Sequence, residues 1–322
     1  MSRIVSITGA TGFIGRRTVE LLLAQGLGVR ALAREPRRLA VPSGEGVEIV
    51  AGDLANGDAL DRLARGSFAV IHCAGEIADP SRYRAANVDG AKALAAAARR
   101  QSVAGFVHVS SLAAREPGLS DYGDSKLQGE DAVREAFGAT ATIVRPPAVY
   151  GPGDRATLPL IAQLTRSTAI LPGTAGQRFS LVHVDDLARA LVALAIASPR
   201  EGAMHEPHDG RQEGYAWSDL AAIAGGAQGR RVRVVHIPHA VLSMAAVAAE
   251  SVSRLSGGRP ALTRGKVAEL YHRDWVCRAG EVPGWRPKMA FAEGFADTLA
   301  WYRRHGWLRL ERGANSTPAT AI

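Results

Sequence analysis

The stretch TGATGFIG (residues 8–15) follows a short apolar run, Ile4–Ile7, and precedes a segment, Phe13–Gln25, whose apolar residues recur at helical spacing. Its three glycines form a GxxGxxG pattern, which permits a tight turn and a close approach of the backbone to a pyrophosphate. The free N–H groups at the start of the following helix favour the same anion. We therefore predict a dinucleotide-binding turn. The residues expected to form it are Gly9, Thr11, Gly12, Phe13, Ile14 and Gly15.

Strand-type and helix-type segments alternate through the first 150 residues. The further apolar runs are Val29–Ala33, Val47–Val50, Ala69–His72, Phe106–Val109 and Thr142–Val144. Helical patterns lie between them at residues 58–65, 82–100 and 122–137. Continuous apolar strands, each followed by a helix, are typical of a parallel sheet that helices cover on both faces. The sequence thus predicts an α/β fold of the Rossmann type, with a doubly wound parallel sheet.

Proline and glycine become frequent after Arg145, which indicates a boundary between two parts of the chain. We predict that residues 1–150 form an NAD(P)-binding Rossmann domain. Residues 177–205 are expected to return to it through a strand at Phe179–Val184 and a helix at Asp185–Ala197. A smaller C-terminal substrate-binding lobe is expected from 151–176 and 206–308, followed by a flexible tail at 309–322. Within the lobe the pattern predicts helices at 217–224, 238–255 and 291–305 and a strand at 232–237.

The composition is typical of a soluble globular protein, with 322 residues of which 47% are hydrophobic and 22% are charged. Two cysteines, Cys73 and Cys277, are too few for a disulfide framework and lie in no zinc-binding pair, so we expect no metal and a reducing, cytoplasmic location.

The N-terminal residues show no secretory-signal pattern. The apolar stretch Ala240–Ala249 is too short to span a membrane, for which about 20 residues are needed, and is expected to form a packed helix.

The chain carries 39 basic and 31 acidic side chains, a formal charge of +8, and its isoelectric point of about 10.0 is shared by many nucleic-acid-binding proteins. The distribution of these charges argues against such a partner. Arginines gather near the N-terminus, while the other basic residues are scattered and are not interleaved with aromatic residues. We therefore expect a small-molecule substrate and no nucleic acid.

The segment LAREPRR (residues 32–38) ends the second predicted strand, where the ribose of a bound dinucleotide is expected. Arg34 can pair with the 2′-phosphate of NADP, whereas an acidic residue at this point favours NAD. Glu35 follows directly, and arginines here can also be solvated surface. NADP is favoured on these residues, and NAD stays open.

The ends of the next two strands carry further candidates for cofactor binding. Asp53 and Leu54 close the third strand, where a carboxylate can accept a hydrogen bond from the adenine amino group. Ala74 and Gly75 close the fourth strand, where small residues let a cofactor lie across the edge of the sheet.

The segment YGDSK (residues 122–126) lies at the start of the helix that follows the fifth strand. Tyr122 and Lys126 are four residues apart, which places them on one face of that helix. A nearby ammonium group favours phenolate and lowers a tyrosine pKa from its usual value of about 10. Ser111, at the end of the preceding strand, can hydrogen-bond the same substrate oxygen. The three residues predict a general acid/base site for a carbonyl or alcohol group.

These motifs resemble those of the extended short-chain dehydrogenases/reductases, the group that contains nucleotide-sugar epimerases and dehydratases, dihydroflavonol-type reductases and 3β-hydroxysteroid dehydrogenases. The resemblance extends from the N-terminus to about residue 308. The segments that carry it are TGATGFIG (8–15), GDL (52–54), HCAG (72–75), NVDGAKAL (87–94), HVSSLAA (108–114), YGDSK (122–126), RPPAVYGPGD (145–154), LVHVDDLARAL (181–191), GWRP (284–287) and EGFADTLAWYRRHGW (293–307).

The resemblance implies roles for individual residues. Tyr122 would be the acid/base, Lys126 would bind the nicotinamide ribose and tune Tyr122, and Ser111 would polarise the substrate oxygen. Asn87 would help to hold a water-linked proton path. Pro146 and the residues on either side of it would border the nicotinamide. Members of the group pair through the helix that carries the tyrosine, which allows a homodimer.

The chain departs from the sugar-modifying members of the group in one region. Ten residues separate Ser111 from Tyr122, fewer than in many of those members, and the VYG turn that often follows the serine in epimerases is absent. This wall of the site is therefore expected to be reduced.

The sequence predicts an NAD(P)-dependent oxidoreductase, in which a hydride moves between the nicotinamide and a carbonyl carbon while Tyr122 transfers the proton. Because the lobe has few clustered charges, a small apolar or modestly polar alcohol or ketone is favoured as substrate. A nucleotide-sugar epimerase or dehydratase is an alternative, since the lobe contains arginines that can bind a diphosphate, namely Arg155, Arg178, Arg211 and Arg231. A non-catalytic cofactor-binding sensor or scaffold is a third hypothesis, against which the intact Ser/Tyr/Lys set argues.

Overall fold

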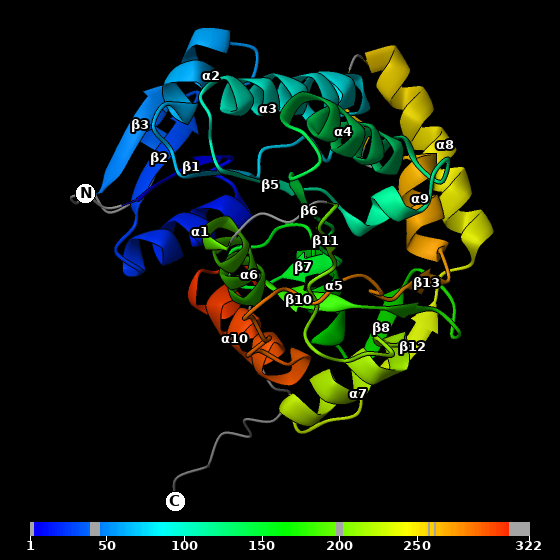
Figure 1. Ribbon diagram of the computed structural model, residues 1–322. Coiled ribbons are helices and arrows are strands. Elements are labelled where there is room, and N and C mark those ends of the chain that lie inside the picture. The colour runs from blue at the N-terminus through cyan, green and yellow to red at the C-terminus, as the bar shows by residue number, and fades with distance from the viewer. Residues whose placement is uncertain (1–2, 39–45, 198–201, 257, 261, 309–322) are drawn as a thin grey trace, which may run out of the picture.

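A seven-stranded parallel sheet forms the centre of the molecule (Figure 1). The computed structural model describes residues 3–38, 46–197, 202–256, 258–260 and 262–308. The strands of the sheet lie in the order β3-β2-β1-β4-β5-β6-β11. Their bounds are β1 Ile4–Thr8, β2 Gly28–Ala33, β3 Val47–Ala51, β4 Ala69–His72, β5 Gly105–Val109, β6 Thr142–Val144 and β11 Met204–His205. The predicted α/β fold of the Rossmann type is confirmed.

Helices cover both faces of this sheet (Figure 1). One face carries α1 Phe13–Ala24 and α6 Val184–Ile196, and the other carries α2 Gly57–Ala64, α3 Gly90–Arg100 and α4 Asp121–Phe137. Side chains of each strand alternate between the two cores, so that Ile71 packs with α1 and α6 while Val70 packs with α2 and α3. Ser120 caps α4, because its side chain accepts a hydrogen bond from the Gly123 N–H.

The C-terminal lobe is built from short paired strands and helices around an aromatic core. Three two-stranded sheets join β7 Ala148–Tyr150 to β10 Leu181–His183, β8 Thr168–Leu171 to β12 Arg233–His236, and β9 Arg178–Phe179 to β13 Asp274–Trp275. The helices are α5 Leu158–Leu164, α7 Trp217–Ala227, α8 His239–Ser256, α9 Arg264–Tyr271 and α10 Phe291–Arg304. Tyr150, Trp217 and Phe295 are buried together in this core. The helices predicted at 217–224 and 291–305 and the strand predicted at 232–237 are thereby confirmed.

The strand predicted at Phe179–Val184 does not return to the central sheet, and this prediction was wrong. The backbone N–H groups of Phe179 and Ser180 donate to the carbonyl oxygens of Tyr215 and Trp275, which draws the segment into the lobe. Its continuation, β10, pairs with β7. The seventh strand of the central sheet is instead β11, which pairs with β6.

The helix predicted at residues 238–255 forms, but it is not a packed helix, and this expectation was wrong. Among the described side chains of α8, Ala246 alone is buried. In Figure 1 this helix lies at the outer edge of the molecule beside α9. Within the described residues, no helix is long and apolar enough to cross a membrane. The predicted flexible tail, 309–322, lies outside the described residues.

Candidate active site

The glycine-rich turn lies where β1 meets α1, at the point where the strand order of the sheet reverses. Ligands of doubly wound folds bind in the crevice at such a point. Gly9 has a φ of +73°, and a Cβ atom there would lie 2.7 Å from the Ala74 nitrogen. A Cβ atom at Gly15 would lie 2.1 Å from the Gly9 carbonyl oxygen. Both positions therefore require glycine.

The start of α1 leaves its N–H groups free for an anion. Gly12 is the N-cap residue, so no side chain caps the helix, and its first turn holds no acidic residue. Thr11 and Gly12 are exposed, while Phe13 and Ile14 are half-buried. Backbone N–H groups in the first turn of a helix have no acceptor within the helix and carry partial positive charge. They can therefore bind the pyrophosphate of a dinucleotide.

The end of β4 forms a second part of this crevice. Ala74 is half-buried and Gly75 is exposed. A Cβ atom at Gly75 would lie 3.0 Å from Asn87 Oδ1 and 3.7 Å from Lys126 Nζ. A side chain at Gly75 would therefore crowd Asn87 beside the buried amine, so this exposed position favours glycine.

Tyr122, Lys126 and Ser111 converge beside this crevice. Both Tyr122 and Lys126 come from α4, and Ser111 follows β5 as the cap of a 3₁₀ turn, Leu112–Arg115. The Ser111 side chain is near enough to Tyr122 to act on its phenol, and it acts to lower the Tyr122 pKa. Lys126 is 4% exposed, and its Nζ donates to the Val109 carbonyl oxygen at 2.9 Å. The structure thus brings together the three residues that the sequence singles out.

The pKa of Tyr122 differs from the sequence-based prediction. Burial raises the pKa of Tyr122 to about 12, and Ser111 opposes this only in part. Burial lowers the pKa of Lys126 to about 8. The expected lowering of the Tyr122 pKa by Lys126 was wrong, because desolvation of the phenol raises this pKa and the Lys126 amine donates to the Val109 carbonyl oxygen.

Asn87 connects two walls of the site through its side-chain amide. Its Nδ2 donates to the Glu76 carbonyl oxygen at 3.0 Å and to Ser125 Oγ at 2.9 Å, and its Oδ1 accepts from the Glu76 N–H at 2.8 Å. It lies in a π-helical turn, Arg84–Asp89, that precedes α3. These bonds hold the loop after β4 against α4, and the predicted role of Asn87 in a proton path stays a prediction.

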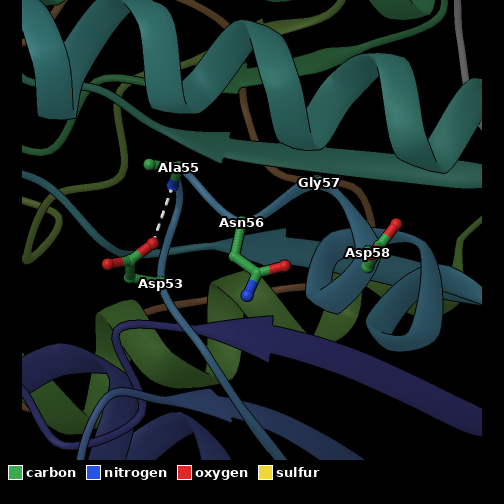
Figure 2. A pocket seen from close by; sticks show the side chains of 5 residues that line it. All are labelled: Asp53, Ala55, Asn56, Gly57 and Asp58. Carbon is green, nitrogen blue, oxygen red and sulfur yellow. Dashed lines mark hydrogen bonds between the residues drawn. The ribbon is translucent and has the colours of Figure 1, made fainter.

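Asp53 lies in a surface pocket at the end of β3 (Figure 2). It accepts a hydrogen bond from the Ala55 N–H at 3.0 Å, and Asn56, Gly57 and Asp58 complete the lining. Acceptor oxygens fit the amino group of an adenine and disfavour a phosphate. Leu54 is half-buried next to this pocket.

Arg34 is exposed at the first position after β2. It therefore lies where a ribose 2′-phosphate is expected, at the carboxyl end of a strand next to β1.

Pro146 lies two residues after β6 and contacts the segment after Ser111, while the arginine before it pairs with α4. The Pro146 carbonyl oxygen accepts from the Leu112 N–H at 2.9 Å, next to Ser111. Arg145 instead forms a two-pronged ion pair with Glu130, with N–O distances of 2.8 and 2.7 Å. Glu130 is fully buried. The arginine therefore anchors α4 to β6, whereas the resemblance implied that it borders the nicotinamide.

Sequence reasoning missed two residues that support Tyr122 and its helix, Glu269 from the lobe and Tyr83 from the segment before α3. Ser120 Oγ donates to Glu269 Oε1 of α9 at 2.6 Å, which ties the cap of α4 to the lobe. The Tyr83 ring lies 5.8 Å from the Tyr122 ring in an edge-on contact. The separation of 149 residues between Ser120 and Glu269 leaves no local pattern from which to find this bond.

Burial also keeps both cysteine thiols protonated. It raises the pKa of Cys73, beside the glycine-rich turn, to about 12, and that of Cys277, in the lobe, to about 12. Both therefore behave as thiols with little thiolate character.

Two histidines are buried beneath the site, and we expect them to govern its acid stability. His72 and His108 face each other on β4 and β5 with ring centroids 5.2 Å apart. Burial lowers the pKa of His72 to about 3 and lowers that of His108 well below its usual value of 6.5. The unfolded chain takes up protons that the folded chain does not, so stability is complete above about pH 6.5 and falls as the pH drops toward 3.

Each of these histidines is expected to make the unfolding free energy fall by about 1.4 kcal/mol per pH unit below pH 6. Urea unfolding at pH 7, 6 and 5 measures this dependence. His108→Leu should remove the part of this pH dependence that one histidine contributes, with wild type as the reference. Equal pH dependences in wild type and His108→Leu would contradict the assignment.

Comparisons with known proteins find relatives that align with most of this chain. The model of the NAD dependent epimerase/dehydratase family matches residues 5–206. A ceramide reductase of Caulobacter vibrioides is 41% identical over 95% of this chain and 96% of its own length. A UDP-glucose 4-epimerase of Mycolicibacterium smegmatis is 27% identical over 92% of this chain and 97% of its own. The structure of MoeE5 in complex with UDP-glucose and NAD has a TM-score of 0.69 at 24% identity, over 94% of this chain and 99% of that one.

These similarities differ in what they establish. The likeness to MoeE5 shows the fold alone. The family match spans more than half of the chain, and the ceramide reductase aligns with nearly all of it. The family match and the ceramide reductase confirm the resemblance to the extended short-chain dehydrogenases/reductases. They also support the prediction that the protein is an NAD-dependent enzyme. The chain belongs to the NAD-dependent epimerase/dehydratase family.

Proposed function

We propose that the protein is an NAD(P)-dependent reductase that converts a carbonyl group on a long-chain lipid of the ceramide type to an alcohol. The observation that carries the proposal is the convergence of three side chains close to the exposed Gly75. They are the half-buried phenol of Tyr122, the hydroxyl group of Ser111, which acts to lower the Tyr122 pKa, and the buried amine of Lys126. The relative named ceramide reductase, 41% identical to this chain, supports the substrate class.

The protonation state of Tyr122 suits reduction. With a pKa of about 12 the side chain is a phenol at neutral pH, so it can give its proton to the alkoxide that forms when a carbonyl carbon accepts a hydride. Ser111 can donate a hydrogen bond to the same oxygen. The reduced nicotinamide, when bound, supplies the hydride. The substrate gains one hydride and one proton, the cofactor is oxidised, and Tyr122 regains its proton from solvent.

The arginines that left a nucleotide-sugar substrate open are mostly engaged within the chain. Arg178 donates to the carbonyl oxygens at residues 213 and 214, and Arg211 pairs with Asp219 at 2.9 Å. Arg155 lies over the Trp307 ring at 4.9 Å. A diphosphate would have to compete with these contacts, which favours an uncharged carbonyl substrate over a nucleotide sugar.

We propose NADP as the preferred cofactor, because Arg34 lies exposed at the ribose end of the crevice. Arg34→Ala should weaken NADPH binding by at least about tenfold, the loss of one charge-assisted phosphate contact, and should leave NADH binding within about twofold. Titration of each cofactor against both proteins measures the two dissociation constants. Arg37→Ala, also exposed and three residues away, is the matched control. Equal losses for the two cofactors would reject the phosphate role.

The activity is tested with a ceramide in which one hydroxyl group is oxidised to a ketone, delivered in detergent micelles. We expect loss of nicotinamide absorbance with stoichiometric alcohol formation. UDP-glucose is the comparison substrate, because its conversion to the 4-epimer without net cofactor oxidation would support an epimerase and contradict the proposal. Bound cofactor without turnover of any carbonyl would support a scaffold. The cytoplasmic location and the homodimer stay predictions.

A further inference from the structure

The exposed side of α8 is apolar. Large apolar side chains recur along it at helical spacing, and they are exposed by 48% at Val241, 66% at Met244, 50% at Val247, 64% at Val252 and 91% at Leu255. These five residues are called here the α8 apolar face. The opposite side, at Ala246, packs inward against the molecule. A contiguous exposed apolar surface of this kind marks an interaction site.

The chain around α8 is rich in basic residues. Residues 229–273 contain eight basic residues and two acidic ones, a net charge of +6 out of the +8 of the whole chain. The basic residues are Arg230, Arg231, Arg233, Arg254, Arg259, Arg264, Lys266 and Arg273. Arg254 is exposed on α8 itself, two turns after Val247 and on the same side of the helix. Apolar and cationic groups thus occur together.

The α8 apolar face is connected to the active site through a short chain of contacts. The helix packs on α9, whose Glu269 accepts from Ser120, the cap of the helix that carries Tyr122. After α8, Arg259 pairs with Asp79 at 3.2 Å in the loop that follows β4. Ile77 in that loop is 67% exposed. Exposed apolar side chains therefore occur on two segments that adjoin the site of Tyr122.

From these observations we propose that the α8 apolar face docks on the surface of an anionic lipid bilayer. An interfacial helix buries its apolar side among the acyl chains, while neighbouring arginine and lysine side chains attract anionic headgroups. Docking in this way brings the side of the molecule where α9 meets the cap of the Tyr122 helix toward the surface where a long-chain lipid resides. The link to the substrate rests on the proposed function, whereas the docking itself does not.

Sedimentation with lipid vesicles tests the docking directly. The full chain is mixed with vesicles of phosphatidylcholine alone, and with vesicles of phosphatidylcholine and phosphatidylglycerol in equal parts. We expect binding to the anionic vesicles, weaker binding to the neutral ones, and weakening of the anionic binding by added salt. Absence of binding to both vesicles at low salt would overturn the proposal.

A triple variant, Met244→Gln, Val252→Gln and Leu255→Gln, keeps good helix formers on an exposed face. It should lower the vesicle partition coefficient by at least about tenfold. The matched control replaces three exposed apolar residues elsewhere, Ile49, Ile170 and Ile196, with glutamine, and should bind within about twofold of wild type. Equal losses in both variants would contradict the assignment to α8.

Two further measurements separate this proposal from its alternatives. If light scattering shows a dimer that the triple variant dissociates, and wild type does not bind vesicles, the α8 apolar face joins two copies and the docking proposal fails. Reduction of a water-miscible ketone should be unchanged in the triple variant. If the protein binds vesicles but reduces no carbonyl, the proposed function is rejected and the docking proposal stands. If it reduces a carbonyl but does not bind vesicles, the docking proposal is rejected and the proposed function stands.

Discussion

Tyr122→Phe is expected to lower kcat for carbonyl reduction by about 10²–10⁴-fold, the range that general acid–base groups contribute. The substitution removes one oxygen atom, and the aromatic ring retains its contact with Tyr83. Because the fold does not depend on that hydroxyl, cofactor affinity and thermal stability should stay close to wild type. Steady-state kinetics at saturating cofactor, together with cofactor titration, measure both quantities.

Tyr83→Phe is the matched control for this prediction. The Tyr83 hydroxyl donates to the Ile77 carbonyl oxygen at 3.2 Å on the exposed side of the site. Its loss should change kcat by less than about threefold, since it removes one neutral hydrogen bond outside the reacting atoms. A drop of less than about 10²-fold in Tyr122→Phe would remove the tyrosine from the proposed proton step.

Arg145→Met is expected to lower the free energy of unfolding by about 3–5 kcal/mol, the cost of leaving a buried charge unpaired. Glu130 is fully buried and accepts from Ser110 Oγ at 2.6 Å as well as from Arg145. Without the guanidinium its carboxylate would have to be buried uncompensated or take up a proton. Urea unfolding at neutral pH measures the loss.

Two further variants locate the origin of that loss. Arg134→Met removes a half-exposed guanidinium 3.6 Å from Glu130 and should cost less than about 1 kcal/mol. Adding Glu130→Gln to Arg145→Met removes the unpaired charge but keeps an acceptor for Ser110, so it should restore most of the stability. If the double variant is no more stable than Arg145→Met, the buried charge is not the cause.

Most of the Rossmann half could be predicted because its information is local. The bounds of β4 and β6 agree with the prediction to the residue, and α1 ends one residue earlier than predicted. A buried parallel strand is a continuous apolar run, and each helix shows one apolar side, so neither needs distant contacts for its recognition. The glycine-rich turn and the Tyr122 to Lys126 spacing are local in the same way.

The lobe and the electrostatics of the site could not be predicted in this manner. The strands β9 and β13 have two residues each and exist only through pairing over almost a hundred positions. The Tyr122 pKa depends on how deeply the fold buries the phenol, which spacing along a helix does not reveal. The α8 segment has the apolar residues of a core helix, yet its large apolar side chains are exposed and, among its described residues, Ala246 alone is buried.

The raised pKa of both native thiols makes the chain a convenient starting point for site-directed labelling. With pKa values of about 12, Cys73 and Cys277 hold almost no thiolate at neutral pH, so maleimide reagents should leave them largely unmodified. A cysteine introduced in place of Leu255, which is 91% exposed, would carry the fastest-reacting thiol. A polarity-sensitive dye at that one position would report the surroundings of α8 in the otherwise unaltered enzyme.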